Sequence, residues 1–250
     1  MNIQFIKNKL RYMKRFLFGS PSNLNDSFPP SEIEFISNFL EENNTVFDIG
    51  ANIGLWSFCL SQLNLNLNII SFEPNPNVVK SLEKNTESIK NITIERFGVG
   101  NKETVAEFYV HPSHGRSSFA YTNEYSGCKV ISLPITTVDS YVKEKSNFPD
   151  LIKVDVEGLE PEVWEGMQSL LPDHKPKVMV FELVERHLLP RGYSVKSVTK
   201  KIVDAGYKCF VYDDDKAEMI TVNVDEFDFP PEKPKPRKFI NFVFVDANLC

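Results

Sequence analysis

The chain has little cysteine and no long apolar run. Its four cysteines, Cys59, Cys128, Cys209 and Cys250, lie far apart and form no C-x-x-C pair. This spacing argues against a disulfide framework and a cysteine-based zinc site, and it favours a reducing cytoplasmic compartment. No segment approaches the roughly 18 uninterrupted apolar residues of a membrane span. Charges also interrupt residues 3–18, so a signal-peptide apolar core is not expected.

The chain also lacks an excess of positive charge and any internal repeat. Its net charge is -6 at pH 7, which predicts no bulk attraction to nucleic acid or to an anionic membrane. The length of 250 residues, with 42% of them hydrophobic, suits one α/β domain with a sizeable core.

The N-terminal segment differs from the rest in charge. Residues 1–19 carry five basic residues and no acid, with apolar residues at helical spacing. This pattern predicts a basic amphipathic helix. The helix either packs on the domain with its lysines in solvent, or it makes a peripheral contact with a membrane surface or a partner. We expect residues 1–30 to form this helix and a linker, and residues 31–250 to form one domain.

Strands and helices alternate from residue 46 onward, which predicts a parallel sheet with right-handed crossovers. Residues 103–136 interrupt the alternation with strand-like pieces around a polar tip at residues 114–118, and we interpret them as a β insertion. The predicted strands are 46–49, 68–72, 91–97, 151–156 and 177–183, and the predicted helices are 55–63, 76–84, 137–145, 161–170 and 195–205.

The C-terminal part has three strand candidates, 208–212, 219–224 and 239–245, without a long helix between them. Such short connections favour antiparallel pairing at one side of the sheet.

A glycine-containing loop follows the first predicted strand. Asp48 ends that strand, and Gly50 and Gly54 allow a sharp turn and a close approach of the backbone to a ligand. Open parallel sheets bind ligands at the carboxyl ends of their strands. Glu73 ends the second predicted strand, where a carboxylate can accept hydrogen bonds from a ribose diol. The loop therefore predicts a nucleotide-type cofactor at this edge of the sheet.

Two cofactor classes suit such an edge, and the glycine spacing separates them. Dinucleotide sites use G-x-G-x-x-G, with the pyrophosphate at the helix N-terminus. Here Gly50 and Gly54 enclose Asn52, and the third glycine is missing. Asp48 would repel a pyrophosphate but suits a cation, and S-adenosylmethionine carries an ammonium, a sulfonium and no phosphate. The loop thus favours S-adenosylmethionine over a nicotinamide cofactor, and a strand–helix turn without a ligand is the remaining interpretation.

Three motifs occur in order at residues 48–54 (DIGANIG), 71–76 (SFEPNP) and 152–160 (IKVDVEGLE). Together they resemble the FkbM family of class I methyltransferases, over about residues 45–183. The resemblance implies a Rossmann-like α/β fold whose mostly parallel, seven-stranded sheet has helices on both faces and an antiparallel last strand. It also implies S-adenosylmethionine as cofactor and O-methylation of a hydroxyl of a sugar, a glycan or a small natural product.

The same resemblance assigns the cofactor-binding residues. The loop residues would surround the methionine and ribose, Glu73 would hold the ribose hydroxyls, and Asp155 would lie near the ammonium or sulfonium. Phe72, Pro74, Gly98 and Val99 would lie near the adenine. The full set is Asp48, Gly50, Ala51, Asn52, Gly54, Glu73, Pro74, Val99 and Asp155.

The third motif predicts the catalytic cluster Lys153, Asp155 and Glu157. Methylation of an alcohol requires removal of a proton, and neighbouring carboxylates can raise one pKa toward that of a useful base. We expect Glu157 to be the base or to orient the acceptor, with both acids on one strand face after Lys153. In one alternative, Asp155, Glu157 and Glu182 hold a divalent metal, which the pattern does not require. In another, the cluster is purely structural.

Four further residues are predicted to contact the acceptor: Ser117, Ser118, Glu182 and His187. His187 is either a base or a solvated loop histidine. Residues 155–158 read DVEG rather than the Asn/Asp-Pro-Pro-aromatic loop of enzymes that methylate exocyclic amines, so we expect a small-molecule or glycan acceptor and no nucleic acid. The alternatives are a non-catalytic module that binds S-adenosylmethionine and a methyltransferase that acts on protein or nucleic acid.

Overall fold

A computed structural model describes residues 30–112, 116–121, 125–213, 216, 218–227 and 241–250. The predicted basic helix of residues 1–19, its linker and part of the predicted insertion tip lie outside the described residues. The fold around the site can be followed without them, because all the predicted catalytic and cofactor-binding residues are described.

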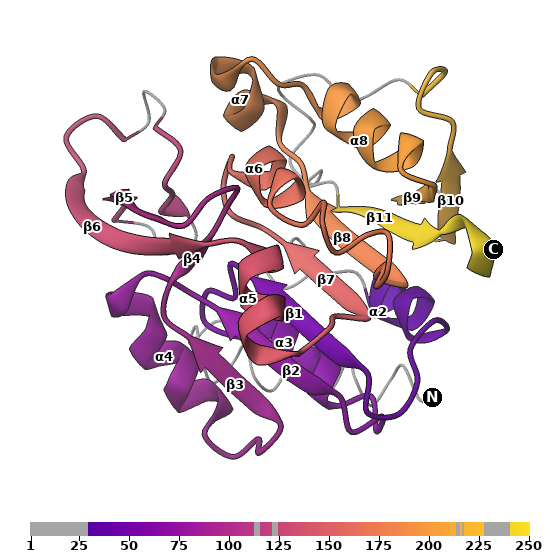
Figure 1. Ribbon diagram of the computed structural model, residues 1–250, viewed down its shortest axis with the longest axis horizontal. Helices are drawn as coiled ribbons and strands as arrows, with labels where there is room; N and C mark the ends of the chain where they lie inside the picture. The colour runs from indigo at the N-terminus through magenta and orange to yellow at the C-terminus, as the bar shows by residue number, and fades with distance from the viewer. Residues whose placement is uncertain (1–29, 113–115, 122–124, 214–215, 217, 228–240) are drawn as a thin grey trace.

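The described core is one eight-stranded sheet in the order β10-β9-β11-β8-β7-β1-β2-β3 (Figure 1). Strands β3, β2, β1, β7 and β8 pair in parallel, as predicted. The strands are β1 Thr45–Ile49, β2 Asn68–Phe72, β3 Ile92–Glu95, β7 Leu151–Val154, β8 Val178–Glu182, β9 Tyr207–Asp213, β10 Glu218–Val222 and β11 Asn241–Asp246.

The last strand, β11, is antiparallel to both of its neighbours, β8 and β9, which confirms the expected antiparallel strand. It lies between them and not at the edge. The edge is β10, which forms an antiparallel pair with β9. The sheet therefore has one strand more than the seven that the family resemblance implies, because the C-terminal part contributes a hairpin as well as the returning strand.

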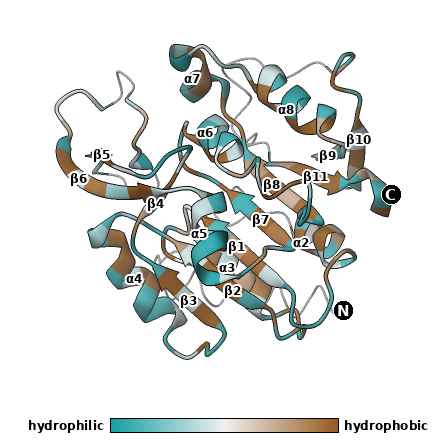
Figure 2. Cartoon of the chain, viewed as in Figure 1, coloured by the Kyte–Doolittle hydropathy of each residue, from teal (hydrophilic) through white to brown (hydrophobic). Residues whose placement is uncertain are grey.

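The central strands are buried on both faces, because helices cover both. Alternate residues of a strand point to opposite faces. In β8, Val178 and Val180 accordingly pack into one apolar core and Met179 and Phe181 into the other. Continuous apolar strands are typical of parallel sheets covered on both sides, and Figure 2 shows this hydrophobic character along β8 and β1.

Helices α2 and α3 pack on the first face, while α5, α6 and α8 pack on the second. In the ranges described, none of the helices combines the length and the apolar character that a membrane crossing needs. The helices are α2 Pro30–Ser37, α3 Leu55–Ser61, α4 Pro76–Thr86, α5 Val138–Lys145, α6 Glu160–Glu165, α7 Glu185–Leu188 and α8 Val195–Asp204, with short 3-10 helices at Leu189–Arg191 and Ala247–Leu249.

One helix ends earlier than its pattern predicts. The sequence favours a helix over residues 161–170, but α6 ends at Glu165. Gly166 packs so tightly on the Gly100 carbonyl that an added Cβ would lie 2.0 Å from its oxygen. This contact joins the chain after α6 to Gly100, which directly follows the short strand Gly98–Val99, and the helix ends there.

The predicted β insertion forms a separate three-stranded sheet. Strand β5, Thr104–Val110, pairs antiparallel with β6, Lys129–Thr136, and the short β4, Gly98–Val99, runs parallel to β6. Figure 1 shows β5 and β6 projecting beyond the main sheet at the upper left. This insertion contributes part of the site, as described below.

Candidate active site

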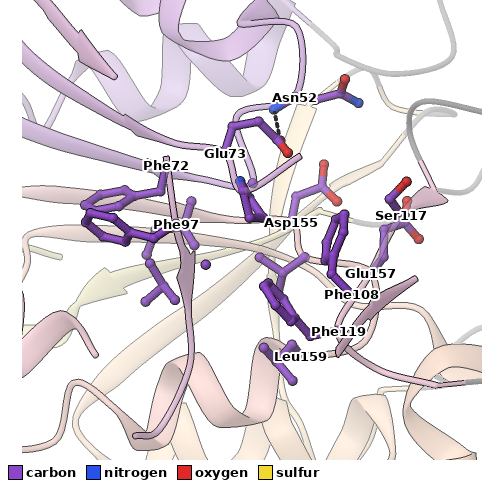
Figure 3. A pocket seen from close by; sticks show the side chains of 16 residues that line it. Asn52, Phe72, Glu73, Phe97, Phe108, Ser117, Phe119, Asp155, Glu157 and Leu159 are labelled. Atoms are coloured by element: carbon purple, nitrogen blue, oxygen red, sulfur yellow. Dashed lines mark hydrogen bonds between the residues drawn. The ribbon is translucent and has the colours of Figure 1, made fainter. Parts of the chain in front are cut away.

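A pocket lies at the carboxyl ends of β1, β2 and β7, where the sequence predicts ligand binding (Figure 3). It encloses about 580 Å³, including its open mouth. Its lining residues are Ile49, Gly50, Asn52, Phe72, Glu73, Pro74, Phe97, Gly98, Val99, Phe108, Ser117, Phe119, Asp155, Val156, Glu157 and Leu159.

The glycine loop is held between the ends of β2 and β7. The backbone N–H groups of Gly50 and Ala51 both donate to Phe72 O at 3.0 Å. Gly50 has a φ of 77°, and an added Cβ would lie 1.8 Å from Asp155 O. Only glycine allows the loop to approach the β7 end this closely. Gly54 is needed for a different contact. A Cβ added at Gly54 would lie 2.5 Å from Leu82 Cδ1, so the loop packs closely on α4.

Asp48 caps helix α3 from beneath the loop. Its Oδ2 accepts hydrogen bonds from Ser57 N at 3.1 Å and Ser57 Oγ at 2.6 Å, and Ser57 Oγ lies 2.7 Å from Ser71 Oγ. A protein carboxylate therefore already accepts from a backbone N–H in the first turn of α3, the kind of donor that a dinucleotide pyrophosphate would use. This arrangement agrees with the interpretation that the loop is not a dinucleotide site.

Lys153 is buried directly below the loop. Its Nζ donates to Gly50 O at 2.9 Å and lies 3.3 Å from Asp48 Oδ1 and 3.4 Å from Asp155 Oδ2. Burial alone would lower the lysine pKa, but the carboxylates of Asp155, Asp48 and Glu182 outweigh it and hold the pKa above its usual value. The protonated lysine thus joins the loop to the acidic end of the site without lining the pocket.

Glu73 lies at the end of β2 with both oxygens oriented by backbone donors. Oε1 accepts from Asn75 N at 2.8 Å, and Oε2 accepts from Asn52 N at 2.9 Å, the bond drawn in Figure 3. Burial nevertheless raises the pKa of Glu73 to about 7. Each carboxylate oxygen has a further lone pair, so the group can still accept hydrogen bonds from a ligand diol.

One side of the pocket is apolar and largely aromatic. Phe72 and Phe97 lie with ring centroids 5.8 Å apart, and the insertion contributes Phe108 and Phe119, with ring centroids 4.8 Å apart. Leu159 completes this side. The sequence does not predict Phe97, Phe108, Phe119 or Leu159 as site residues. The only signal for Phe97 and Phe119 is their position beside Gly98 and the two predicted serines.

Two acidic residues also line the pocket, Asp155 and Glu157. Strand β7 ends at Val154, so Asp155 and Glu157 lie in the turn that follows it and not on one strand face as predicted. The turn uses left-handed backbone at Glu157, with φ 55°, and at Gly158, with φ 105°. Both acids nevertheless line the pocket, because this turn directs the chain back over the end of β1.

Glu160 stabilises this turn from inside. Its Oε1 accepts from Val156 N at 3.1 Å, and its Oε2 accepts from Gly158 N at 3.0 Å. Burial raises the Glu160 pKa to about 7. Although Glu160 is the first residue of α6, these hydrogen bonds go to the turn that precedes the helix.

The acids also affect one another. Burial raises the pKa of Glu157 well above its usual value, and repulsion from Asp155 and Glu160 adds to this, against the opposing charges of Arg186 and Arg116. Burial likewise raises the pKa of Glu182, with repulsion from Asp155 next. In the part of the chain that the structure describes, no group of three or more His, Cys, Asp or Glu side chains could hold a metal ion, so the metal alternative has no support there.

The two predicted serines of the insertion differ in position. Ser117 lines the pocket, and its Oγ accepts from His111 N at 3.1 Å. Ser118 is buried, and its hydroxyl lies 2.9 Å from Glu157 O and 3.1 Å from Val156 O. Ser118 thus attaches the insertion to the acidic turn, and neither it nor Glu182 lines the pocket.

His187 is not a solvated loop residue, which corrects one of its two predicted environments. It lies in α7 and is only 4% exposed, and it does not line the pocket. Its Nδ1 lies 3.2 Å from Glu157 Oε2. Of the predicted cofactor residues, Asp48, Ala51 and Gly54 lie behind the pocket wall, while the others line it. Their contacts with a cofactor remain predictions.

Comparison with known proteins places this site in context. The methyltransferase FkbM domain matches residues 48–209 of the chain. A hexuronic acid methyltransferase of Haloferax volcanii, AglP, is 29% identical over 167 residues, which cover 66% of this chain and 64% of AglP. The match thus spans just under two thirds of that relative's length.

Solved structures match the chain only at low similarity. Fibrillarin of Aeropyrum pernix, solved with natively bound S-adenosyl-L-methionine, is 14% identical with a TM-score of 0.45, covering 82% of this chain and 67% of that one. A SAM-dependent O-methyltransferase of Thermotoga maritima is 10% identical with a TM-score of 0.47, covering 94% and 70%. Similarity at this level supports no particular acceptor.

Proposed function

The chain belongs to the FkbM methyltransferase family, and from this premise we propose that it uses S-adenosylmethionine to methylate a hydroxyl of a sugar or glycan. The observation that carries the proposal is the combination, in one pocket, of aromatic side chains, a buried carboxylate at Glu73 and the acids Asp155 and Glu157. S-adenosylmethionine has the matching sequence of groups, namely an adenine, a ribose diol and a cationic methionine.

Two observations test whether these residues suit the cofactor. Glu73 is fixed by two backbone donors and can still accept hydrogen bonds from ribose hydroxyls. Asn52 lines the pocket, and in the described part of the chain its buried Oδ1 has no hydrogen-bond partner, so an ammonium or hydroxyl donor from a ligand would satisfy it. The aromatic side would hold the adenine and Asp155 the cationic end. The residues present therefore fit the group.

When bound, S-adenosylmethionine supplies an electrophilic methyl group on a sulfonium, which is already a good leaving group. The chain's own residues must then orient the acceptor and remove its proton. We assign removal of the acceptor proton to Glu157, because Glu157 lines the pocket and burial raises its pKa toward the range of a useful base. We assign Lys153 a positioning role, since it contacts the loop and both aspartates from below.

The acceptor that we favour is an acidic sugar, the class named for the Haloferax volcanii relative. Arg116 is exposed on the insertion, next to Ser117 in the pocket wall, and its charge acts on Glu157. A guanidinium there could bind a sugar carboxylate in a bidentate manner. The net charge of -6 favours such a small acceptor over nucleic acid.

Two further parts of the proposal concern the cellular compartment and a contact with the membrane. The four cysteines are free thiols, which suits the reducing cytoplasm that we propose as the compartment. A peripheral membrane contact through residues 1–19 would bring the enzyme to lipid-linked glycans, and these residues lie outside the described part of the chain.

The test is a methyl-transfer assay with labelled S-adenosylmethionine and a panel of uronic acids, neutral hexoses and lipid-linked glycans, analysed by mass spectrometry. We expect methylation of a uronic acid or uronate-containing glycan, and loss of most of it in Arg116→Gln and in Glu157→Gln. Transfer to neutral hexoses alone would contradict the acidic acceptor. Full activity of Glu157→Gln would remove Glu157 as the base.

A further inference from the structure

A chain of three side chains leads from α7 to the pocket. His187 Nδ1 lies 3.2 Å from Glu157 Oε2, and Arg186 Nε donates to His187 Nε2 at 3.1 Å. Only Glu157 of the three lines the pocket, while His187 is buried behind it. The histidine therefore contacts the proposed base and not the proposed acceptor.

The two contacts determine the protonation of the imidazole. Because Arg186 Nε carries a hydrogen and has no lone pair to offer, His187 Nε2 must be the acceptor. In a neutral imidazole the proton then lies on Nδ1, the ring nitrogen that faces Glu157 Oε2 at 3.2 Å. An N–H group directed at a carboxylate stabilises its ionised form.

The backbone supports the same contact. Glu157 has a left-handed φ of 55°, which is unfavourable for a residue with a side chain. The surroundings hold it in place, since Gly158 packs on His187, where an added Cβ would lie 3.2 Å from the histidine Cβ, and Arg191 Nη1 donates to Gly158 O at 2.6 Å. The structure thus keeps the Glu157 carboxylate beside His187 at the expense of local strain.

We propose that His187 is a positioning residue, which uses its Nδ1–H to hold Glu157 ionised and directed into the pocket. The inference rests on the proposed function, in which Glu157 takes the proton of the acceptor hydroxyl. His187 itself gains no proton. One oxygen of Glu157 accepts the histidine hydrogen bond, and the other remains for the acceptor.

Several charged groups influence Glu157, and each acts in a known direction. Asp155 of the same turn and Glu160 at the start of α6 favour the protonated form of Glu157, and Glu182 at the end of β8 is close enough for mutual repulsion. Arg186 of α7 and Arg116 of the insertion favour the ionised form. A variant must therefore change the His187 contact while leaving these five charges in place.

His187→Leu and His187→Asn provide that comparison. Leucine fills a similar volume without a donor, whereas the asparagine side-chain N–H can replace Nδ1–H. The readout is the pH titration of the Glu157 carboxyl carbon, followed by NMR in ¹³C-glutamate-labelled protein and assigned by its loss in Glu157→Gln. We expect His187→Leu to raise the midpoint by about one pH unit and His187→Asn to leave it near the wild-type value. His174→Ala, at an exposed histidine that stacks on Phe148, is the control and should change nothing.

A second measurement needs no acceptor. The imidazole ¹⁵N shifts of His187 should show a neutral ring protonated at Nδ1. An unchanged Glu157 midpoint in His187→Leu, or a His187 ring protonated at Nε2, would overturn the inference. These readouts are independent of turnover, so they separate its failure from that of the proposed function, which the activity of Glu157→Gln tests.

Discussion

Glu73 illustrates how one buried side chain links cofactor binding to pH. Its carboxyl has a pKa of about 7, because burial outweighs the two backbone donors and Lys153. Ribose hydroxyls donate best to the ionised form. As the pH falls through 7 the group gains a proton, and its value as an acceptor decreases.

From this we predict that the affinity for S-adenosylmethionine falls as the pH drops below about 7, by up to tenfold per pH unit. Glu73→Ala should weaken binding by about 1 to 3 kcal/mol at pH 8 and remove this part of the pH dependence. Calorimetric titration at several pH values measures both effects. The control is Glu83→Ala on α4, which removes the exposed ion-pair partner of Arg96. Wild-type affinity in Glu73→Ala would exclude Glu73 as the ribose ligand.

At the residue scale, the sequence predicted polar site residues better than apolar ones. Gly50, Glu73 and Glu157 stand at strand ends within recognisable motifs, and all three line the pocket. Phe108 and Phe119 reach it only because the insertion folds back over the acidic turn, which no local pattern records. The burial of His187 depends in the same way on the packing of α7 against Gly158.

At the scale of elements, the loop between β1 and α3 depends on two features at once. Gly50 has a positive φ, and it also lacks the Cβ that would overlap Asp155 O. Gly192 has a nearly equal φ of 81°, but no atom lies within 4 Å of where its Cβ would be. Substitutions at Gly50 and Gly192 therefore distinguish the cost of backbone strain from the cost of separating the ends of β1 and β7.

We predict that Gly192→Ala costs about 1 kcal/mol of unfolding free energy, which is the strain of a left-handed residue. Gly50→Ala should cost more than about 3 kcal/mol, or abolish cofactor binding in a folded protein, because the loop must move away from β7. Urea unfolding and cofactor titration of both variants test this. Equal effects of the two substitutions would show that the close approach of Gly50 to Asp155 O contributes nothing to stability or to cofactor binding.

The order of elements was largely predictable, and their ends were less so. Alternating apolar runs with glycine and proline between them predicted β1, β2, β7 and β8 to within a residue or two. The two-residue strand β4 and the four-residue helix α7 are too short to show periodicity. Helix α6 ends early because of the contact between Gly166 and Gly100, which are far apart in the sequence.

At the scale of the whole molecule, the pocket joins three parts of the chain. The main sheet supplies the loop and Glu73, the turn after β7 supplies the acids, and the insertion closes one side through Phe108 and Phe119. Ser118 connects the insertion to the turn by contacts with Val156 and Glu157. The cofactor and the acceptor are thus expected to meet where the two sheets adjoin.

The most direct test of this account is calorimetric titration of the full chain with S-adenosylmethionine and, separately, with NAD at pH 8. The account predicts saturable binding of one S-adenosylmethionine per chain, weakened in Glu73→Ala, and no binding of NAD. Binding of NAD, or no heat with S-adenosylmethionine at millimolar concentration, would contradict it.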